Sequence, residues 1–233
     1  MKNKLVEDRE KTGSYFQLGL NIGIWILYIL WILFVSSTEL TLINFLLHCV
    51  FLSIIIILNF DCLKKCFQSF KSEKKKVRTI LLIVLILFGV LIISNVVISM
   101  LANSLNISDQ STKTIQELFY NFPWGTLFAF FLTAIFYPIV EELIFKKSLS
   151  DAIKSPVLFV IISSLLAWYF QVSLISPKVS EFVLGLTSLF NAIALGIVYI
   201  RKDKNVLYTI FPRVVFNIII SIFNIAAIFL VVI

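Results

Sequence analysis

Two adjacent carboxylates, Glu141 and Glu142, lie inside a stretch of the chain, residues 128–145, that is otherwise uncharged and largely apolar. An ionisable residue at the centre of a membrane-spanning helix costs roughly 2.5–3.5 kcal/mol, so such residues face a protein interior or a wet cavity. A carboxylate held in that setting can serve as a general base toward a water molecule. The pair is therefore the first candidate for a functional site.

Polar residues on later apolar segments can lie at the same depth in a bilayer. A helix that continues from the glutamates to Lys154 places Glu141 roughly 20 Å from its end, at about 1.5 Å per residue. The two later segments that start from the same side bring three polar residues to roughly 14–22 Å: Gln171, Arg213 and Asn217. We therefore expect these residues to meet the glutamates at one level of the membrane.

The same residues can form either a charge cluster or a catalytic cavity. Lys146 lies one helical turn after Glu142, and Arg213 is a cation available to Glu141. In the first interpretation these charges neutralise one another and hold the helices in register. In the second, a carboxylate activates a water molecule. Spacing alone leaves both interpretations open.

The chain as a whole has the composition of a membrane protein. Of its 233 residues 60% are hydrophobic, 23 are phenylalanine, and long uncharged runs recur. A membrane-spanning helix needs about 20 mostly apolar residues. Six or seven segments meet this requirement: residues 15–35, 40–60, 79–101, a stretch centred on 124–140, 156–174, 182–200 and 206–233. We expect an all-α fold class, a polytopic integral membrane helix bundle of about seven transmembrane helices, with the last one single or broken at Pro212.

Basic residues indicate how these helices are oriented. They precede the first span and recur in residues 64–78, at Lys154 and in residues 201–204, whereas the opposite connections hold little beyond Lys113 and Lys178. By the positive-inside rule, the N-terminus is cytoplasmic and the chain is a multi-pass protein of the cell membrane. A nucleic-acid partner is not expected, because these loops are taken to lack interleaved exposed aromatic residues. Residues 64–78 could contact lipid headgroups.

Three other features bear on the site only indirectly. His48 lies in the second span with no acidic residue nearby in sequence, so we expect a packed helix residue rather than a ligand. Cys49, Cys62 and Cys66 match neither a metal-binding pattern nor an extracellular disulfide framework. Residues 101–121 form the one sizeable external loop, which can hold a short interfacial helix.

Residues 138–146, with Glu141 and Glu142, resemble the Glu-Glu-x-x-x-Arg signature of the CPBP intramembrane proteases, also called Abi or CAAX protease-like, with Lys146 in place of Arg. Residues 163–171 are similar to the family's Phe-x-x-x-His motif and residues 213–217 to its His-x-x-x-Asn motif. The resemblance covers residues 122–220. It implies a CPBP/Abi-like membrane core over residues 122–233, preceded in residues 1–121 by N-terminal membrane helices, a basic cytoplasmic loop and an external loop.

In that family the first motif's glutamate is taken to activate water, two histidines and an asparagine complete the site, and some members are described as metalloproteases. The resemblance therefore implies five catalytic positions: Glu141, Glu142, Gln171, Arg213 and Asn217. Both histidines are replaced here, by Gln171 and Arg213. Glutamine does not titrate and arginine has no lone pair to offer a metal. We accordingly expect no metal and no other cofactor.

The departures favour a catalytically impaired homologue. By resemblance, such a protein acts as a membrane partner or regulator of cell-envelope proteins, or in bacteriocin self-immunity. Its expected partners are the lipid bilayer and another membrane or cell-envelope protein. The alternative is an active intramembrane endopeptidase in which Glu141 is the base, Gln171 polarises the scissile carbonyl and Arg213 stabilises the oxyanion. A transporter or channel is disfavoured, since no repeated half or pair of broken helices is visible.

Overall fold

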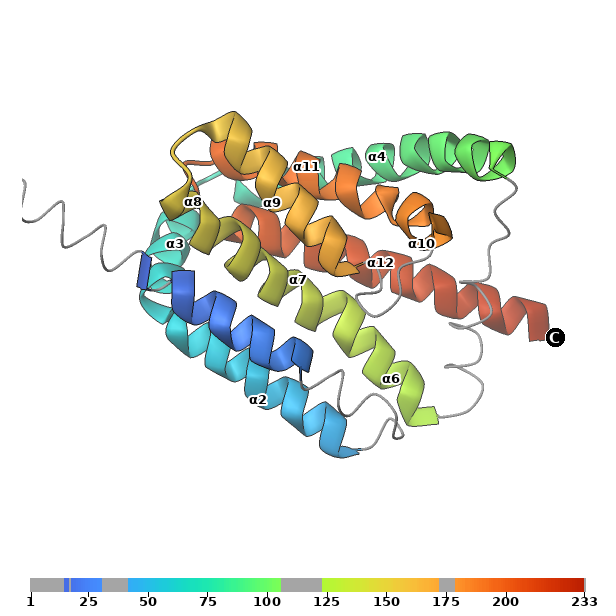
Figure 1. Ribbon diagram of the computed structural model, residues 1–233, viewed down its shortest axis with the longest axis horizontal. Coiled ribbons are helices and arrows are strands. Elements are labelled where there is room, and N and C mark those ends of the chain that lie inside the picture. The colour runs from blue at the N-terminus through green and yellow to red at the C-terminus, as the bar shows by residue number, and fades with distance from the viewer. Residues whose placement is uncertain (1–14, 17, 31–41, 106–122, 172–178, 233) are drawn as a thin grey trace, which may run out of the picture.

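The computed structural model describes residues 15–16, 18–30, 42–105, 123–171 and 179–232, and every regular element in these ranges is a helix. In chain order the helices are Leu18–Leu30, α2 (Leu42–Leu58), α3 (Phe60–Ser72), α4 (Lys76–Ser104), α6 (Pro123–Phe131), η1 (Leu132–Phe136), α7 (Tyr137–Glu141), η2 (Glu142–Ser148), α8 (Leu149–Ala152), α9 (Pro156–Gln171), α10 (Val179–Leu184), α11 (Leu186–Arg201) and α12 (Leu207–Val232). The elements α6 to α8 follow one another without a break and form one long helix, the central helix. Figure 1 shows the helices packed into one bundle.

Among the described residues, four helices are long and apolar enough to cross a membrane: Lys76–Ser104, Leu127–Ala152, Phe182–Arg201 and Leu207–Ala226. The bent pair of α2 and α3 makes a fifth when it is taken as one span, while Leu18–Leu30 and Pro156–Tyr169 are shorter apolar helices. Each of the seven expected segments thus contains an apolar helix, and four or five of these helices are long enough to count as spans among the described residues. The expected class, a helical polytopic membrane bundle, is confirmed.

The central helix is enclosed by its neighbours, and this is what buries the two glutamates. Half of the residues in its apolar window are buried, compared with 22% in each of the other three long spans. Successive residues of a helix point about 100° apart, so two adjacent side chains are both buried where a wide sector of the helix surface is packed. Glu141 and Glu142 are 3% and 0% exposed. The helix also continues past them to Ala152, as expected from the sequence.

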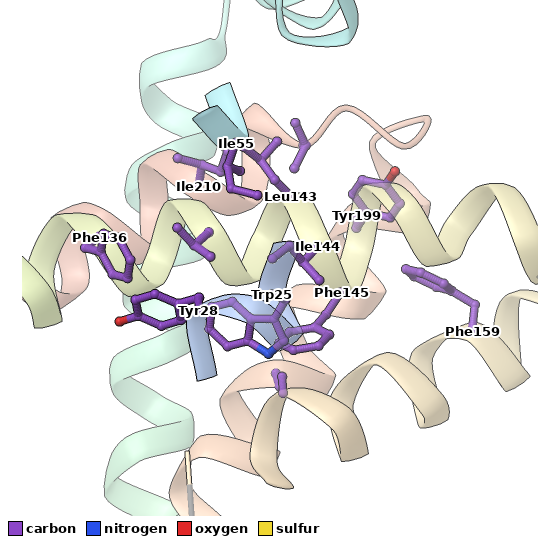
Figure 2. Packing of buried hydrophobic residues seen from close by; sticks show 14 residues of the cluster. Trp25, Tyr28, Ile55, Phe136, Leu143, Ile144, Phe145, Phe159, Tyr199 and Ile210 are labelled. Atoms are coloured by element: carbon purple, nitrogen blue, oxygen red, sulfur yellow. The ribbon is translucent and has the colours of Figure 1, made fainter. Parts of the chain in front are cut away.

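Aromatic side chains pack between the central helix and the two N-terminal helices, and Figure 2 shows Trp25 and Tyr28 lying beside Phe145. Trp25 and Tyr28 stack with ring centroids 5.2 Å apart, and Tyr28 stacks on Phe51 of α2 at 4.4 Å. Trp25 also meets Phe145 of the central helix edge to face at 5.9 Å. His48 packs into this group, with its Nδ1 atom 2.7 Å from a backbone carbonyl one turn earlier. It is a packed helix residue, as expected.

A second, polar contact joins the N-terminal helices to the central helix. Asn21 donates to the hydroxyl of Ser148 at 2.6 Å and exchanges longer hydrogen bonds of 3.3 and 3.4 Å with Asn59. All three side chains are buried. Asn59 lies where the chain bends by 73° between α2 and α3, so the network fixes this bend. Sequence analysis did not anticipate the bend.

Two further expectations concern the last span and the external loop. The last span is a single helix, α12, with Pro212 inside it. Because proline has no N–H, the carbonyl of Tyr208 lacks its helical donor, yet the helix continues. The short interfacial helix considered for the external loop falls largely on residues 106–122, which lie outside the described residues.

Candidate functional site

Four charged side chains, here called the charge cluster, meet where α12 packs against η1 and α7: Glu141, Glu142, Lys146 and Arg213. Arg213 donates from Nη1 to Oε1 of Glu142 at 3.0 Å and from Nη2 to Oε2 of Glu141. Lys146 donates to the same Glu142 oxygen at 2.7 Å. The expected pairing of Arg213 with Glu141 is present, and Arg213 holds the second carboxylate as well.

The charge cluster is electrically balanced and almost completely shielded from solvent. Arg213 is 13% exposed and the other three side chains are 3% exposed or less. Two carboxylates and two cations cancel when all four are ionised. An uncompensated charge in this position would carry a desolvation penalty of several kcal/mol. The pairing therefore explains how the bundle holds two adjacent glutamates in its interior.

A π-helical turn begins at the second glutamate. The segment η2 covers Glu142–Ser148, and six of its seven residues are buried. π-Helical turns are rare and often lie at functional sites, because the extra residue in the turn changes which side chains share a face. Here both the Glu142–Lys146 ion pair and the Ser148 hydroxyl that bonds Asn21 belong to this turn. The sequence carries no residue pattern that marks such a turn.

Asn217 lies one turn after Arg213 and faces the same way, as its spacing predicts. Its amide donates to the backbone carbonyl of Thr133 in η1 at 2.8 Å, so it fastens α12 to the central helix about two turns before Glu141 rather than at the glutamates themselves. Asn217 and Arg213 also line a cavity of about 120 Å³ between α4, α11 and α12. The other lining residues are Leu87, Ser188, Asn191, Ala192, Leu195 and Phe216.

Asn191 is a polar residue of this cavity that sequence analysis missed. Its Oδ1 atom is buried and has no hydrogen-bond partner among the described residues. The available signal was an asparagine in the middle of the apolar segment 182–200, of the same kind that marked Asn217. Gln171 is the last residue of α9, and its side chain lies outside what the structure describes. Its expected approach to the glutamates stays a prediction.

A divalent cation does not fit the charge cluster. Lone pairs of Glu141 and Glu142 are directed at Arg213, and a guanidinium offers only donors. Within the described ranges, no group of three or more His, Cys, Asp and Glu side chains is placed to share an ion. The arrangement is suited to ion pairing between helices rather than to metal coordination.

The fold and the charge cluster together define a polytopic helical membrane protein with a buried ionic site on its central helix. Residues 123–219 match the family model described as Type II CAAX prenyl endopeptidase Rce1-like. The matched region starts at the first residue of the central helix and includes the whole charge cluster and Asn217. The match supports the CAAX protease-like family for this region of the chain, as its motifs indicated. No curated protein and no solved structure matches the chain.

Proposed function

We propose that this CAAX protease-like membrane protein lacks peptidase activity and acts as a partner or regulator of another membrane or cell-envelope protein, with bacteriocin self-immunity as one such role. The supporting observation is the double contact of Arg213 with Glu141 and Glu142. The position that a histidine takes in the family motif is filled here by a fixed cation that binds both carboxylates.

The chemical argument concerns what a general base must do. It has to accept a proton from a water molecule that lies within hydrogen-bonding distance and is aligned with the substrate. One oxygen of each glutamate is already engaged by a cation, and Glu142 is shared between Arg213 and Lys146. Water activation would have to use the remaining carboxylate oxygens, in a site that is shielded from solvent. The charge cluster then serves stability, and the interaction with a partner takes place on the outer surface.

The alternative is the glutamate-dependent endopeptidase that uses Glu141 with Gln171. The cavity beside Arg213 favours it, because Asn191 and Asn217 present amide groups there and the space can hold a short polar group. Glu142 also retains one oxygen, Oε2, without a hydrogen-bond partner among the described residues. In this alternative, a peptide carbonyl would enter the cavity, and a water molecule would reach a carboxylate oxygen that Arg213 does not bind.

The proposed orientation has the N-terminus in the cytoplasm of the cell. It is supported by the way basic segments far apart in sequence meet at one end of the bundle. Lys202 pairs with Glu73 at 3.0 Å, and Lys204 donates to the carbonyl of Ser150 at 3.1 Å. The segments before α4, after η2 and after α11 therefore share one side, which suits the positive-inside rule. Reporter fusions at the α11–α12 turn test the assignment, and periplasmic or external reporter activity there would overturn it.

The decisive experiment separates a peptidase from a partner. A deletion strain is complemented with the wild type, Glu141→Gln and the double variant Glu141→Gln with Arg213→Met, which restores charge balance. Bacteriocin sensitivity and co-purifying membrane proteins are compared at matched protein level. We expect the double variant to keep the wild-type phenotype, since no catalytic base is needed. Loss of the phenotype in a normally accumulated double variant, together with wild-type cleavage of a prenylated peptide, would support the peptidase instead.

A further inference from the structure

The helix α3 lies across the end of the bundle where the basic segments meet (Figure 1). The 73° bend after α2 turns it away from the direction of the preceding apolar helix. Its inner face packs on the start of α12, where the ring of Phe70 lies 5.0 Å from that of Tyr208. Asn205 donates to the carbonyl of Cys66 at 2.9 Å and holds the middle of α3 in place.

A second face of α3 is apolar and basic at once, and nothing in the described residues covers it. Phe60 and Phe67 are 59% and 53% exposed. Lys64 and Lys71 are also exposed. Residues 60, 64, 67 and 71 follow one another at intervals of three or four, so these four side chains share one side of the helix. This side points about 100° away from the packed side on a helical wheel. The expectation that the basic segments lack exposed aromatic residues was therefore wrong, because Phe67 is exposed among the lysines of residues 64–78.

The positive charge around this face is not neutralised within the described part of the chain. Six exposed cations between residues 64 and 78 have no carboxylate partner there: Lys64, Lys65, Lys71, Lys74, Lys75 and Arg78. Glu73, the carboxylate nearest in sequence, is engaged by Lys202 and Tyr208. This end of the molecule is therefore strongly positive and attracts anionic partners.

We propose that α3 is an interfacial helix that binds anionic phospholipids of the leaflet at the basic end of the bundle. Phe60 and Phe67 lie at the boundary between headgroups and acyl chains, and Lys64 and Lys71 contact the lipid phosphates. Interfacial helices carry large apolar side chains such as phenylalanine on one part of their surface and lysines beside them. They lie in the plane of the membrane surface. Clusters of four to eight basic residues beside a membrane span attract anionic lipids.

The geometry favours lipid over a protein partner. The packed face of α3 fixes the helix beside the start of α12, where the exposed side chain of α12 is the apolar Phe211. The Phe and Lys face is then turned sideways, toward lipid, while Lys65 lies about another 100° round the helix, toward water. Alternation of phenylalanine and lysine on one face fits a surface that is apolar below and anionic above.

The test measures which lipids stay bound to the full chain. Purified protein is placed in nanodiscs of phosphatidylglycerol in a fixed excess of phosphatidylcholine, extracted again in mild detergent and analysed by native mass spectrometry. We expect the retained lipid to be enriched in phosphatidylglycerol. Lys64→Gln should lower this enrichment about fivefold, whereas the neighbouring Lys65→Gln, with the same change of charge, should leave it within about twofold.

A second pair of variants tests the contact of the phenylalanine side chains with lipid. Phe67→Gln should lower the retained phosphatidylglycerol, and Ser69→Gln, which introduces the same side chain at an exposed position on the other side of the helix, should not. These side chains are exposed, so the variants are expected to elute as the wild type in size exclusion. If Lys64→Gln does not elute as the wild type does, Lys71→Gln on the same face of α3 is used instead. Retained lipid in the bulk ratio, or equal losses from Lys64→Gln and Lys65→Gln, would overturn the proposal, since either result leaves α3 without a lipid-contacting face.

Discussion

The Nη1 atom of Arg213 lies 3.0 Å from Oε1 of Glu142, and this contact joins two helices whose residues are 71 positions apart. The same guanidinium holds Glu141 through its second nitrogen. A bidentate arrangement of this kind is specific to arginine, because its donors are fixed in one plane. One side chain of α12 thus neutralises two adjacent residues of the central helix.

Removing this arginine should destabilise the protein strongly. Arg213→Met leaves one negative charge uncompensated inside the bundle, which costs about 3–5 kcal/mol. Adding Glu141→Gln restores charge balance and should recover much of the loss. Thermal unfolding in one detergent compares the single and double variants, with the exposed Arg201→Met as the control for loss of a cation. If the single and double variants melt at the same temperature, Arg213 is not the counter-ion of these glutamates.

Purified protein should carry no stoichiometric zinc. The carboxylate oxygens that would coordinate a metal are bound to Arg213 and Lys146, and a cation at those positions repels a second one. Elemental analysis after purification without chelators measures the metal content. About one tightly bound zinc per chain, lost in Glu141→Gln, would contradict the ion-paired description of the site.

Close packing of α9 on α11 should make position 196 sensitive to size. A Cβ atom added to Gly196 would lie 3.3 Å from Cγ1 of Val160, a distance that requires the neighbour to move. Gly196→Leu should therefore destabilise the protein by about 1–3 kcal/mol, and Val160→Ala should relieve part of the effect. Gly89→Leu is the matched control, because no atom lies within 4 Å of a Cβ built there. Equal losses at the two glycines would show that the contact with Val160 is not responsible.

The sequence predicted the features that depend on composition and on single spacings. Apolar runs located the helices, and the depth of Arg213 in its span predicted its meeting with Glu141. The bend at Asn59 and its partner Asn21 were missed, because a buried asparagine shows that a hydrogen bond is needed without showing which residue supplies it. The π-helical turn at Glu142 was missed for a related reason, since it depends on tertiary packing and not on residue type.

The contact that fixes α3 against α12 should respond to acid. Glu73 accepts hydrogen bonds from the hydroxyl of Tyr208 and, at 3.0 Å, from Lys202. Chiefly because of the Tyr208 hydrogen bond, and then because of Lys202, the pKa of the Glu73 carboxyl is lowered below its ordinary value of 4.5. A lowered folded-state pKa means that the stabilisation is fully present above the ordinary value and is lost as the pH falls through the lowered one.

Tyr208→Phe tests this coupling, because it removes the hydroxyl and keeps the ring over which Lys202 lies at 4.7 Å. Melting temperatures in detergent are recorded from about pH 6 to about pH 3, and the drop on acidification should be smaller in the variant than in the wild type, by at most about 2–4 °C for so exposed a carboxylate. In a Glu73→Gln background the same substitution should leave the pH profile unchanged. A profile that Tyr208→Phe alters equally in both backgrounds would show that Glu73 is not the titrating group.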